Sequence, residues 1–112
     1  MPDKTPIYAS ESGTVIEAQI EHGYGNYIKI QHNNQVYTAY AHLYQINVSV
    51  GQRVERGQLI ALSGGVAGRV TSGTSTGPHL HFEVYIGGRT HNYRVDPLSC
   101  LSNIDEHLYY YT

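Results

Sequence analysis

Two histidines stand one residue apart in a segment that reads as a β-strand, and their spacing suits metal chemistry. The segment is residues 75–84, with the sequence STGPHLHFEV. Alternation along a strand places His79, His81 and Glu83 on one face and the intervening apolar residues on the other. A neutral imidazole is a good Zn²⁺ ligand, and a second imidazole can move protons near neutral pH. Such a pair alone is more often ordinary polar surface, but the Gly-Pro turn and the apolar face favour a built site.

A third histidine, His42, lies in a second strand-like run with the sequence YAHL over residues 40–43. It is also flanked by apolar residues. We expect His42, His79 and His81 to converge at one end of a groove. The imidazoles of His42 and His81 should then lie within about 10 Å of each other, the reach of groups that share one ion or its bound water.

Five segments together resemble one known family. They occur in order at residues 13–15, 23–32, 40–43, 50–61 and 75–84. Their sequences are similar to those of the lysostaphin-type zinc endopeptidases, which cut the cross-bridges and peptide stems of peptidoglycan. The resemblance covers roughly residues 5–98. It implies a compact all-β antiparallel sheet or sandwich, a groove that carries the histidine cluster, and peptidoglycan or its peptide stems as the partner.

The resemblance also implies roles for the three histidines. His81 matches the family's zinc ligand, the second histidine of the His-x-His pair. His79 and His42 match the two catalytic histidines, which act on the metal-bound water and the tetrahedral intermediate. Glu83 shares the face of His81, so it is expected either to orient that imidazole or to form a buried ion pair.

The N-terminal part of the family pattern is not matched. The other two zinc ligands belong to a His-x-Gly-x-Asp-type motif ahead of the segment matched here by residues 5–9. Asp3 is the only acidic residue before Thr5 and is too close to Pro6 to fit, and no histidine precedes His22. A catalytic zinc normally has three protein ligands. The resemblance therefore implies that zinc binds this chain weakly or not at all.

Three explanations remain open at this point. The chain can be a degenerate family member, it can receive the missing ligands from an N-terminal segment or a neighbouring chain, or it can use replacement ligands. The replacement candidates are His22, His91, Asp96 and His107. Two functions follow: a peptidoglycan metalloendopeptidase once its zinc site is completed, or an incomplete family member that acts as a cell-wall-binding, regulatory or structural domain, for example in a phage virion.

Aromatic and loop residues supply the expected groove. The chain has eleven tyrosines and no tryptophan, most of them in strand-like positions where cross-strand packing is the usual role. Tyr40 precedes His42 by two residues, so it is expected to share its face and to line the groove. Thr76 and Gly77 end a Gly/Ser/Thr-rich loop over residues 64–77, which either shapes the groove wall or is a mobile surface loop. His32 reads as a hydrogen-bonded structural residue.

Composition narrows the function classes. The net charge of −2 and the scattered basic residues give no reason to expect a nucleic-acid surface. No apolar stretch reaches the ~20 residues of a membrane span, and the first residues lack the apolar segment of a signal peptide. By resemblance the setting is the cell envelope, the extracellular space or a phage virion. Residues 50–61 also resemble lipoyl and biotinyl carrier domains, but neither lysine lies at a hairpin tip.

The predicted elements are almost all strands. Alternating or apolar runs predict strands over about 13–18, 27–31, 36–41, 59–63 and 80–85. Asn33-Asn34 predicts a hairpin turn and Gly87-Gly88 a second tight turn. A short helix is expected over 97–103. We expect one peptidase-like domain over residues 1–112, with a C-terminal tail over 99–112.

Overall fold

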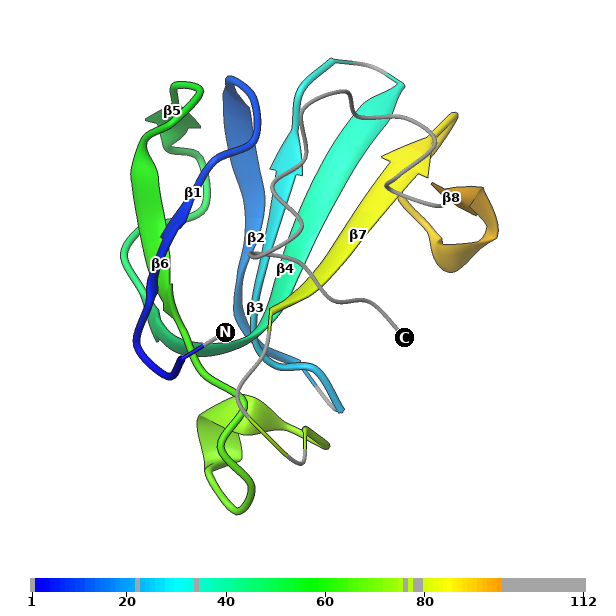
Figure 1. The fold of residues 1–112 in the computed structure, drawn as a ribbon. Helices are drawn as coiled ribbons and strands as arrows, with labels where there is room; N and C mark the ends of the chain where they lie inside the picture. Colours follow the sequence, from blue (N-terminus) through cyan, green and yellow to red (C-terminus); the bar gives the residue numbers. More distant parts are fainter. Residues whose placement is uncertain (1, 22, 34, 76, 78–79, 96–112) are drawn as a thin grey trace.

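The computed structural model describes residues 2–95 except 22, 34, 76 and 78–79. Figure 1 shows that the chain forms one strongly curved, eight-stranded sheet with antiparallel pairing throughout. The strands are β1 (Pro6–Tyr8), β2 (Gly13–Glu21), β3 (Gly25–Gln31), β4 (Val36–Ile46), β5 (Arg53–Val54), β6 (Leu59–Ser63), β7 (His81–Ile86) and β8 (Arg94–Val95). Two short 3₁₀ turns, η1 (Val70–Ser72) and η2 (His91–Tyr93), are the only helical elements in the described ranges. The predicted all-β antiparallel fold is confirmed.

Strand β4 organises the sheet because it pairs with three other strands. One of its edges pairs with β3. The other edge pairs with β7 from Val36 to Ala41 and with β6 from Leu43 to Ile46. The neighbour of β4 therefore changes at His42, which lies between these two stretches. The fold itself puts one of the predicted site residues at a fork between strands.

The two faces of the sheet carry different packing. On one face the main core combines aliphatic residues with Tyr40 and Phe82, whose rings lie 5.2 Å apart. On the other face a smaller cluster contains three tyrosines and two alanines, namely Tyr27, Tyr37, Ala39, Ala41 and Tyr85. His81 and Glu83 alternate with the core residues along β7 and so lie on this second, tyrosine-rich face.

The segment 64–77 packs against the turn between β2 and β3 with almost no space between the two backbones. A Cβ atom on Gly25 would overlap the carbonyl oxygen of Thr71, and one on Gly73 would overlap that of Gly23. The Thr74 amide and hydroxyl both donate to the Gly23 carbonyl, at 3.0 Å each. Both parts lie at the lower end of the sheet in Figure 1, where β7 begins.

Most predicted elements agree with the structure. All five predicted strands are present, although β2 and β4 run several residues beyond their predicted ends. The hairpin between β3 and β4 is confirmed, and the side chain of Asn33 accepts hydrogen bonds from the Gln35 and Val36 amides. The short strands β1, β5 and β8 were not predicted. The expected helix over 97–103 lies outside the described residues, within which no helix is long and apolar enough to cross a membrane.

Candidate functional site

His42 occupies a left-handed backbone conformation that a histidine rarely adopts. Its φ is 59°, and the pairing of β4 with β3 shifts register between Asn26 and Ile28, opposite this part of β4. Such a β-bulge re-aims a side chain and interrupts the alternation of the strand. Without the bulge, His42 would share the core face of Tyr40. With it, the His42 ring turns toward His81.

The His42 ring is fixed by the segment 64–77. Its Nδ1 lies 2.6 Å from the carbonyl oxygen of Ser72, and both residues are buried. A carbonyl oxygen can only accept a hydrogen bond, so Nδ1 carries the hydrogen and Nε2 is the basic nitrogen of the neutral ring. The backbone is fixed as well, because the His42 amide donates to the Tyr24 carbonyl at 2.8 Å. The structure thus sets both the orientation and the tautomer of His42.

His81 meets His42 at the start of β7. The centroids of the two rings are 5.6 Å apart and the rings are nearly perpendicular, well inside the 10 Å expected from the sequence. His81 Nε2 lies 3.0 Å from Glu83 Oε2. The other nitrogen, Nδ1, is buried and has no hydrogen-bond partner among the described residues. A buried polar atom in this state is uncommon and calls for an explanation.

Glu83 is the centre of a buried hydrogen-bond network. Its carboxylate accepts from His81 Nε2 at 3.0 Å, from the Tyr24 hydroxyl at 3.1 Å, from the Tyr85 hydroxyl at 2.6 Å and from Arg94 Nη1 at 2.8 Å. Burial by itself would raise the pKa of Glu83, but the hydrogen bonds from His81, Tyr85 and Arg94 together outweigh it and lower the pKa to about 2. Both expected contacts of Glu83 are therefore present: it bonds to an imidazole nitrogen, and its buried carboxylate forms an ion pair with the partly exposed Arg94.

The ionised Glu83 determines the state of the His81 ring. A carboxylate accepts hydrogen bonds only, so His81 Nε2 carries a hydrogen, and in the neutral ring Nδ1 carries a lone pair. A histidine that donates one ring nitrogen to a carboxylate while the other stays available is the usual arrangement of a metal ligand. The unpartnered Nδ1 of His81 therefore fits a zinc ion. The described residues contain no group of three or more ligands that could complete such a site.

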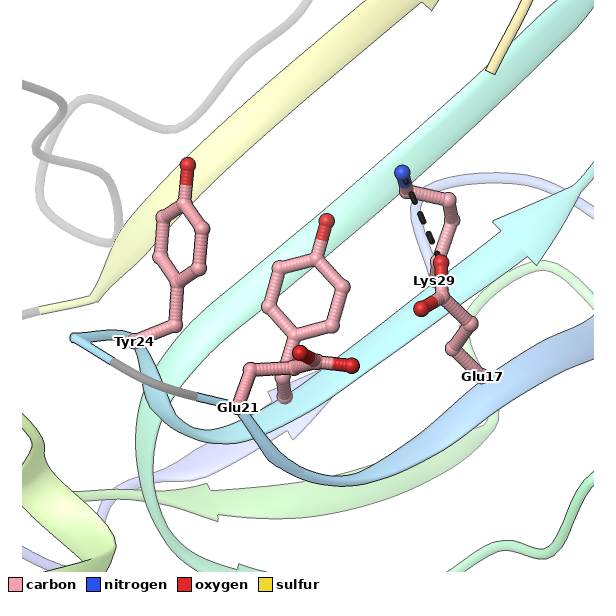
Figure 2. Close-up of a pocket in the computed structure, with 5 residues that line it drawn as sticks. Glu17, Glu21, Tyr24 and Lys29 are labelled. Carbon is pink, nitrogen blue, oxygen red and sulfur yellow. Dashed lines mark ion pairs between the residues drawn. The ribbon is translucent and has the colours of Figure 1, made fainter. Parts of the chain in front are cut away.

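Tyr24 connects this cluster to a shallow pocket. Its ring lies 5.5 Å from the His81 ring, and burial together with the neighbouring Glu83 charge raises its pKa to about 12, so the hydroxyl stays protonated and donates. The pocket holds about 130 Å³ and is lined by residues of β2, β3 and their turn: Glu17, Glu21, Tyr24, Tyr27 and Lys29. Figure 2 shows that these side chains stand on one side of the β2–β3 hairpin, with the Tyr24 hydroxyl directed toward β7.

The charges in the pocket are partly paired within the fold. Lys29 Nζ lies 3.5 Å from Glu17 Oε2, the contact drawn as a dashed line in Figure 2. The same ammonium donates to the Arg89 carbonyl at 2.8 Å and lies 4.2 Å from the centroid of the Tyr85 ring. Lys29 therefore anchors the pocket floor to the segment that follows β7.

Some predicted site residues do not lie where they were expected, and others lie outside the described residues. Tyr40 does not line a groove: it is fully buried in the main core, and its hydroxyl donates to Ser10 Oγ. The expectation failed because the bulge at His42 removes the two residues from a common face. Gly77 lies in the loop, where its amide donates to Ser75 Oγ at 3.4 Å. Thr76 and His79 lie outside the described residues, as do the replacement candidates His22, Asp96 and His107 and the side chain of His91.

The structure adds residues that the sequence did not single out. Ser72 contributes only its backbone carbonyl, which leaves no signature in the sequence. Tyr24 belongs to the 23–32 segment and was expected, like the other strand tyrosines, to pack across the sheet or to line the groove, and its bond to Glu83 was not foreseen. Tyr85 alternates with Glu83 on β7 and could have been assigned to its face, whereas Arg94 reaches Glu83 from β8, a strand that was not predicted.

Comparisons with known proteins agree with this geometry. The family described as peptidase family M23 matches residues 1–97. The chain is 48% identical over 92 residues to the peptidoglycan DD-endopeptidase ShyA of Vibrio cholerae serotype O1, a match that covers 82% of this chain and 20% of ShyA. The chain therefore spans about a fifth of the length of that relative.

Solved structures show the same fold. The catalytic domain of the antimicrobial peptidase lysostaphin from Staphylococcus simulans superposes with a TM-score of 0.79 at 36% identity, covering 88% of this chain and 71% of that one. A zinc-containing peptidase from Vibrio cholerae superposes with a TM-score of 0.73 at 43% identity, covering 86% of this chain and 26% of that one.

Proposed function

Because this chain belongs to peptidase family M23, we propose that it forms the hydrolytic domain of a peptidoglycan metalloendopeptidase. The observation that carries the proposal is the state of His81, whose Nε2 is held by Glu83 while its buried Nδ1 has no partner among the described residues. The substrate class is supported by the relative ShyA, which is a peptidoglycan DD-endopeptidase. The proposed substrate is a peptide bond in the stems or cross-links of the cell wall.

In this proposal His81 is a zinc ligand through Nδ1. When bound, zinc supplies Lewis acidity and lowers the pKa of a coordinated water toward neutrality. Glu83 keeps the His81 ring in the tautomer that presents a lone pair, and Arg94, Tyr24 and Tyr85 keep Glu83 ionised and in place. No group of three or more possible ligands lies together among the described residues.

His42 is proposed as a proton-transfer residue. Its Nε2 is the basic nitrogen of the neutral ring, since Nδ1 donates to the Ser72 carbonyl. A neutral imidazole can take up a proton on its basic nitrogen and return it during a reaction. The carbonyl behind the ring also favours a positive charge on it when Nε2 takes up a proton. His79 is proposed as the second catalytic histidine, on the family resemblance alone.

A second candidate function is a domain that holds cell-wall peptides without cutting them. The observation in its favour is that the part of the chain described by the structure supplies one metal ligand and no complete set. The two functions differ in one measurable property, because a binding domain does not need a hydrolytic zinc. As given, the chain is expected to retain zinc weakly and below one ion per molecule, which elemental analysis after dialysis would measure.

The proposed function is tested by completing the site. A segment with a His-x-Gly-x-Asp-type motif is joined ahead of Met1, at the family's spacing from Thr5, so that Asp3 is kept. We expect one zinc per chain and release of peptides from cross-linked peptidoglycan, followed by mass spectrometry. His42→Ala should lower the rate by about 10²–10⁴-fold, the usual contribution of an acid–base group. His81→Ala should abolish zinc retention.

The matched control is His32→Asn. The ring of His32 forms hydrogen bonds with the Ser12 carbonyl and the Thr38 hydroxyl. Neither partner belongs to the cluster of His42, His81 and Glu83, so this variant should keep its zinc and most of its activity at pH 7.5. A completed domain that is folded and holds zinc, yet releases no peptide from any wall preparation, would overturn the hydrolytic proposal and leave the binding function in its place.

A further inference from the structure

Arg69 anchors the part of the segment 64–77 that fixes His42. This residue precedes η1, and its carbonyl accepts from the Ser72 amide at 3.1 Å, so the backbone of Arg69 and Ser72 forms one closed turn. Ser72 in turn holds His42 Nδ1 through its carbonyl at 2.6 Å. A shift of Arg69 would therefore move the Ser72 carbonyl, and with it the His42 ring, because one short turn joins Arg69 to Ser72.

The Arg69 side chain is tied to the beginning of the described chain. Its Nη1 and Nη2 donate to the two carboxylate oxygens of Asp3, both at 2.8 Å, in a bidentate pair. The guanidinium also lies 4.9 Å from the centroid of the Tyr44 ring. About three quarters of each charged side chain is removed from solvent. Planar bidentate pairs of this kind have a defined geometry and are stronger than ordinary surface pairs.

Asp3 is itself held in place because the two residues that follow it bond to the last residue of β6. The amide of Lys4 donates to the Ser63 carbonyl at 2.7 Å, and the amide of Thr5 donates to the Ser63 hydroxyl at 2.9 Å. Ser63 ends β6, which pairs with β4 next to His42. The carboxylate that holds Arg69 thus stands in a turn whose next two residues are bonded to the end of β6.

The residues that follow Ser72 are held by other contacts. Gly73 and Thr74 pack on the turn between β2 and β3, and the Ser75 hydroxyl donates to the Gly65 carbonyl at 2.8 Å. Between these two ends lies Val70, which is 77% exposed and adds little packing of its own. The place of Ser72 is therefore set by an ion pair on one side and by backbone contacts on the other.

We propose that the Asp3–Arg69 pair is a positioning device for His42, which sets the place of the Ser72 carbonyl and through it the orientation and tautomer of the imidazole. Arg69 is a positioning residue in this scheme, because it acts through Ser72 and does not touch the reacting groups. The consequence for catalysis rests on the proposed function of His42, but the consequence for the ring itself does not.

The first test reads the His42 ring directly. In the ¹⁵N-histidine-labelled chain, the buried Nδ1–H of His42 should give a slowly exchanging imidazole NH signal, assigned by its loss in His42→Ala. We expect Arg69→Ala to speed its exchange with solvent at least tenfold or to broaden it away, and Arg69→Lys to have a smaller effect. Asp3→Asn should speed the exchange of this hydrogen as much as Arg69→Ala does. The double variant should show no faster exchange than either single variant, since both substitutions remove the same interaction.

The matched control is Arg53→Ala. Arg53 is largely exposed and lies 3.9 Å from Glu55 in a weak surface pair, so its removal should leave the His42 signal unchanged. The charge-reversed pair Asp3→Arg with Arg69→Asp should restore part of the protection. If circular dichroism shows that Arg69→Ala is unfolded, the His42 signal is compared between the parent chain and the Asp3→Asn and Arg69→Lys variants instead. A folded Asp3→Asn or Arg69→Ala variant with an unchanged His42 signal would overturn the proposal.

The second test uses the domain with a completed zinc site. Arg69→Ala should lower kcat by about 10- to 100-fold with KM nearly unchanged, as expected when a catalytic group is slightly misplaced. If no variant cleaves peptidoglycan, the proposed function fails, while the imidazole signal still decides whether Arg69 positions His42. If cleavage occurs and Arg69→Ala cleaves as fast as the parent, the positioning role fails and the proposed function stands.

Discussion

Gly23 and Gly25 flank Tyr24 in the turn between β2 and β3, and they offer a matched pair of substitutions. Both have positive φ angles, +82° and +68°, so alanine at either position pays a similar backbone cost. Their surroundings differ. A Cβ on Gly23 would meet nothing within 4 Å, whereas a Cβ on Gly25 would overlap the Thr71 carbonyl and lie 2.6 Å from the Gly73 nitrogen.

The expected losses of stability follow from that difference. Gly23→Ala should lower the free energy of unfolding by about 1 kcal/mol, the usual cost of placing alanine in the left-handed region. Gly25→Ala carries the same cost and must also push two backbones apart, which adds about 1–3 kcal/mol. Gly25→Ala should therefore be about 2 kcal/mol less stable than Gly23→Ala.

Urea unfolding at pH 7.5, followed by far-ultraviolet circular dichroism, measures both values. Gly25→Ala should also disturb the imidazole NH signal of His42, because Thr71 is the neighbour of Ser72. Equal losses for the two variants would refute the reasoning, since they would mean that the segment 64–77 is not in close contact with the hairpin.

Three further changes test other parts of the structure. Glu83→Gln should lower the free energy of unfolding by about 3 kcal/mol in chemical denaturation, because the amide presents an NH₂ group to donors such as His81 Nε2; a loss below 1 kcal/mol would contradict the network. Tyr40→Phe should cost about 1 kcal/mol, since it removes the buried bond to Ser10 Oγ, and unchanged stability would argue against that bond. Burial lowers the pKa of His32 from 6.5, so the contribution of His32 to the stability of the fold is complete above pH 6.5 and is lost as the pH falls. The melting temperature should therefore differ less between pH 7.5 and pH 5.5 in His32→Asn than in the parent chain, and an equal difference would refute this assignment.

The strands were predictable because their signals are local. Alternation along residues 36–41 and 80–85, with turn residues between the runs, is enough to place β4 and β7. Strands β5 and β8 have two residues each and depend on pairing partners distant in the sequence, so no local pattern marks them. The same limit applies to β1, which is defined by its pairing with β6.

The proximity of His42 and His81 was predicted correctly, but the route to it was not. The sequence argument treated residues 40–43 as a regular strand, which placed Tyr40 and His42 on one face. The bulge at His42 lies in the pairing of β4 with β3, and no local signal in residues 40–43 marks it. Contacts through backbone atoms, such as the Ser72 carbonyl, and ion pairs over 66 positions, such as Asp3–Arg69, are likewise invisible to local patterns.

The left-handed backbone of His42 sets the stability of the fold against the proton-transfer role proposed for this residue. A non-glycine residue at a φ of 59° is held there at a cost on the order of 1 kcal/mol. Glycine would relieve that strain but would remove the imidazole, and asparagine would relieve part of it while keeping a polar side chain. Selection for thermal stability alone would therefore favour replacing His42. In a screen of position 42, the variants with a higher melting temperature should lose hydrolysis.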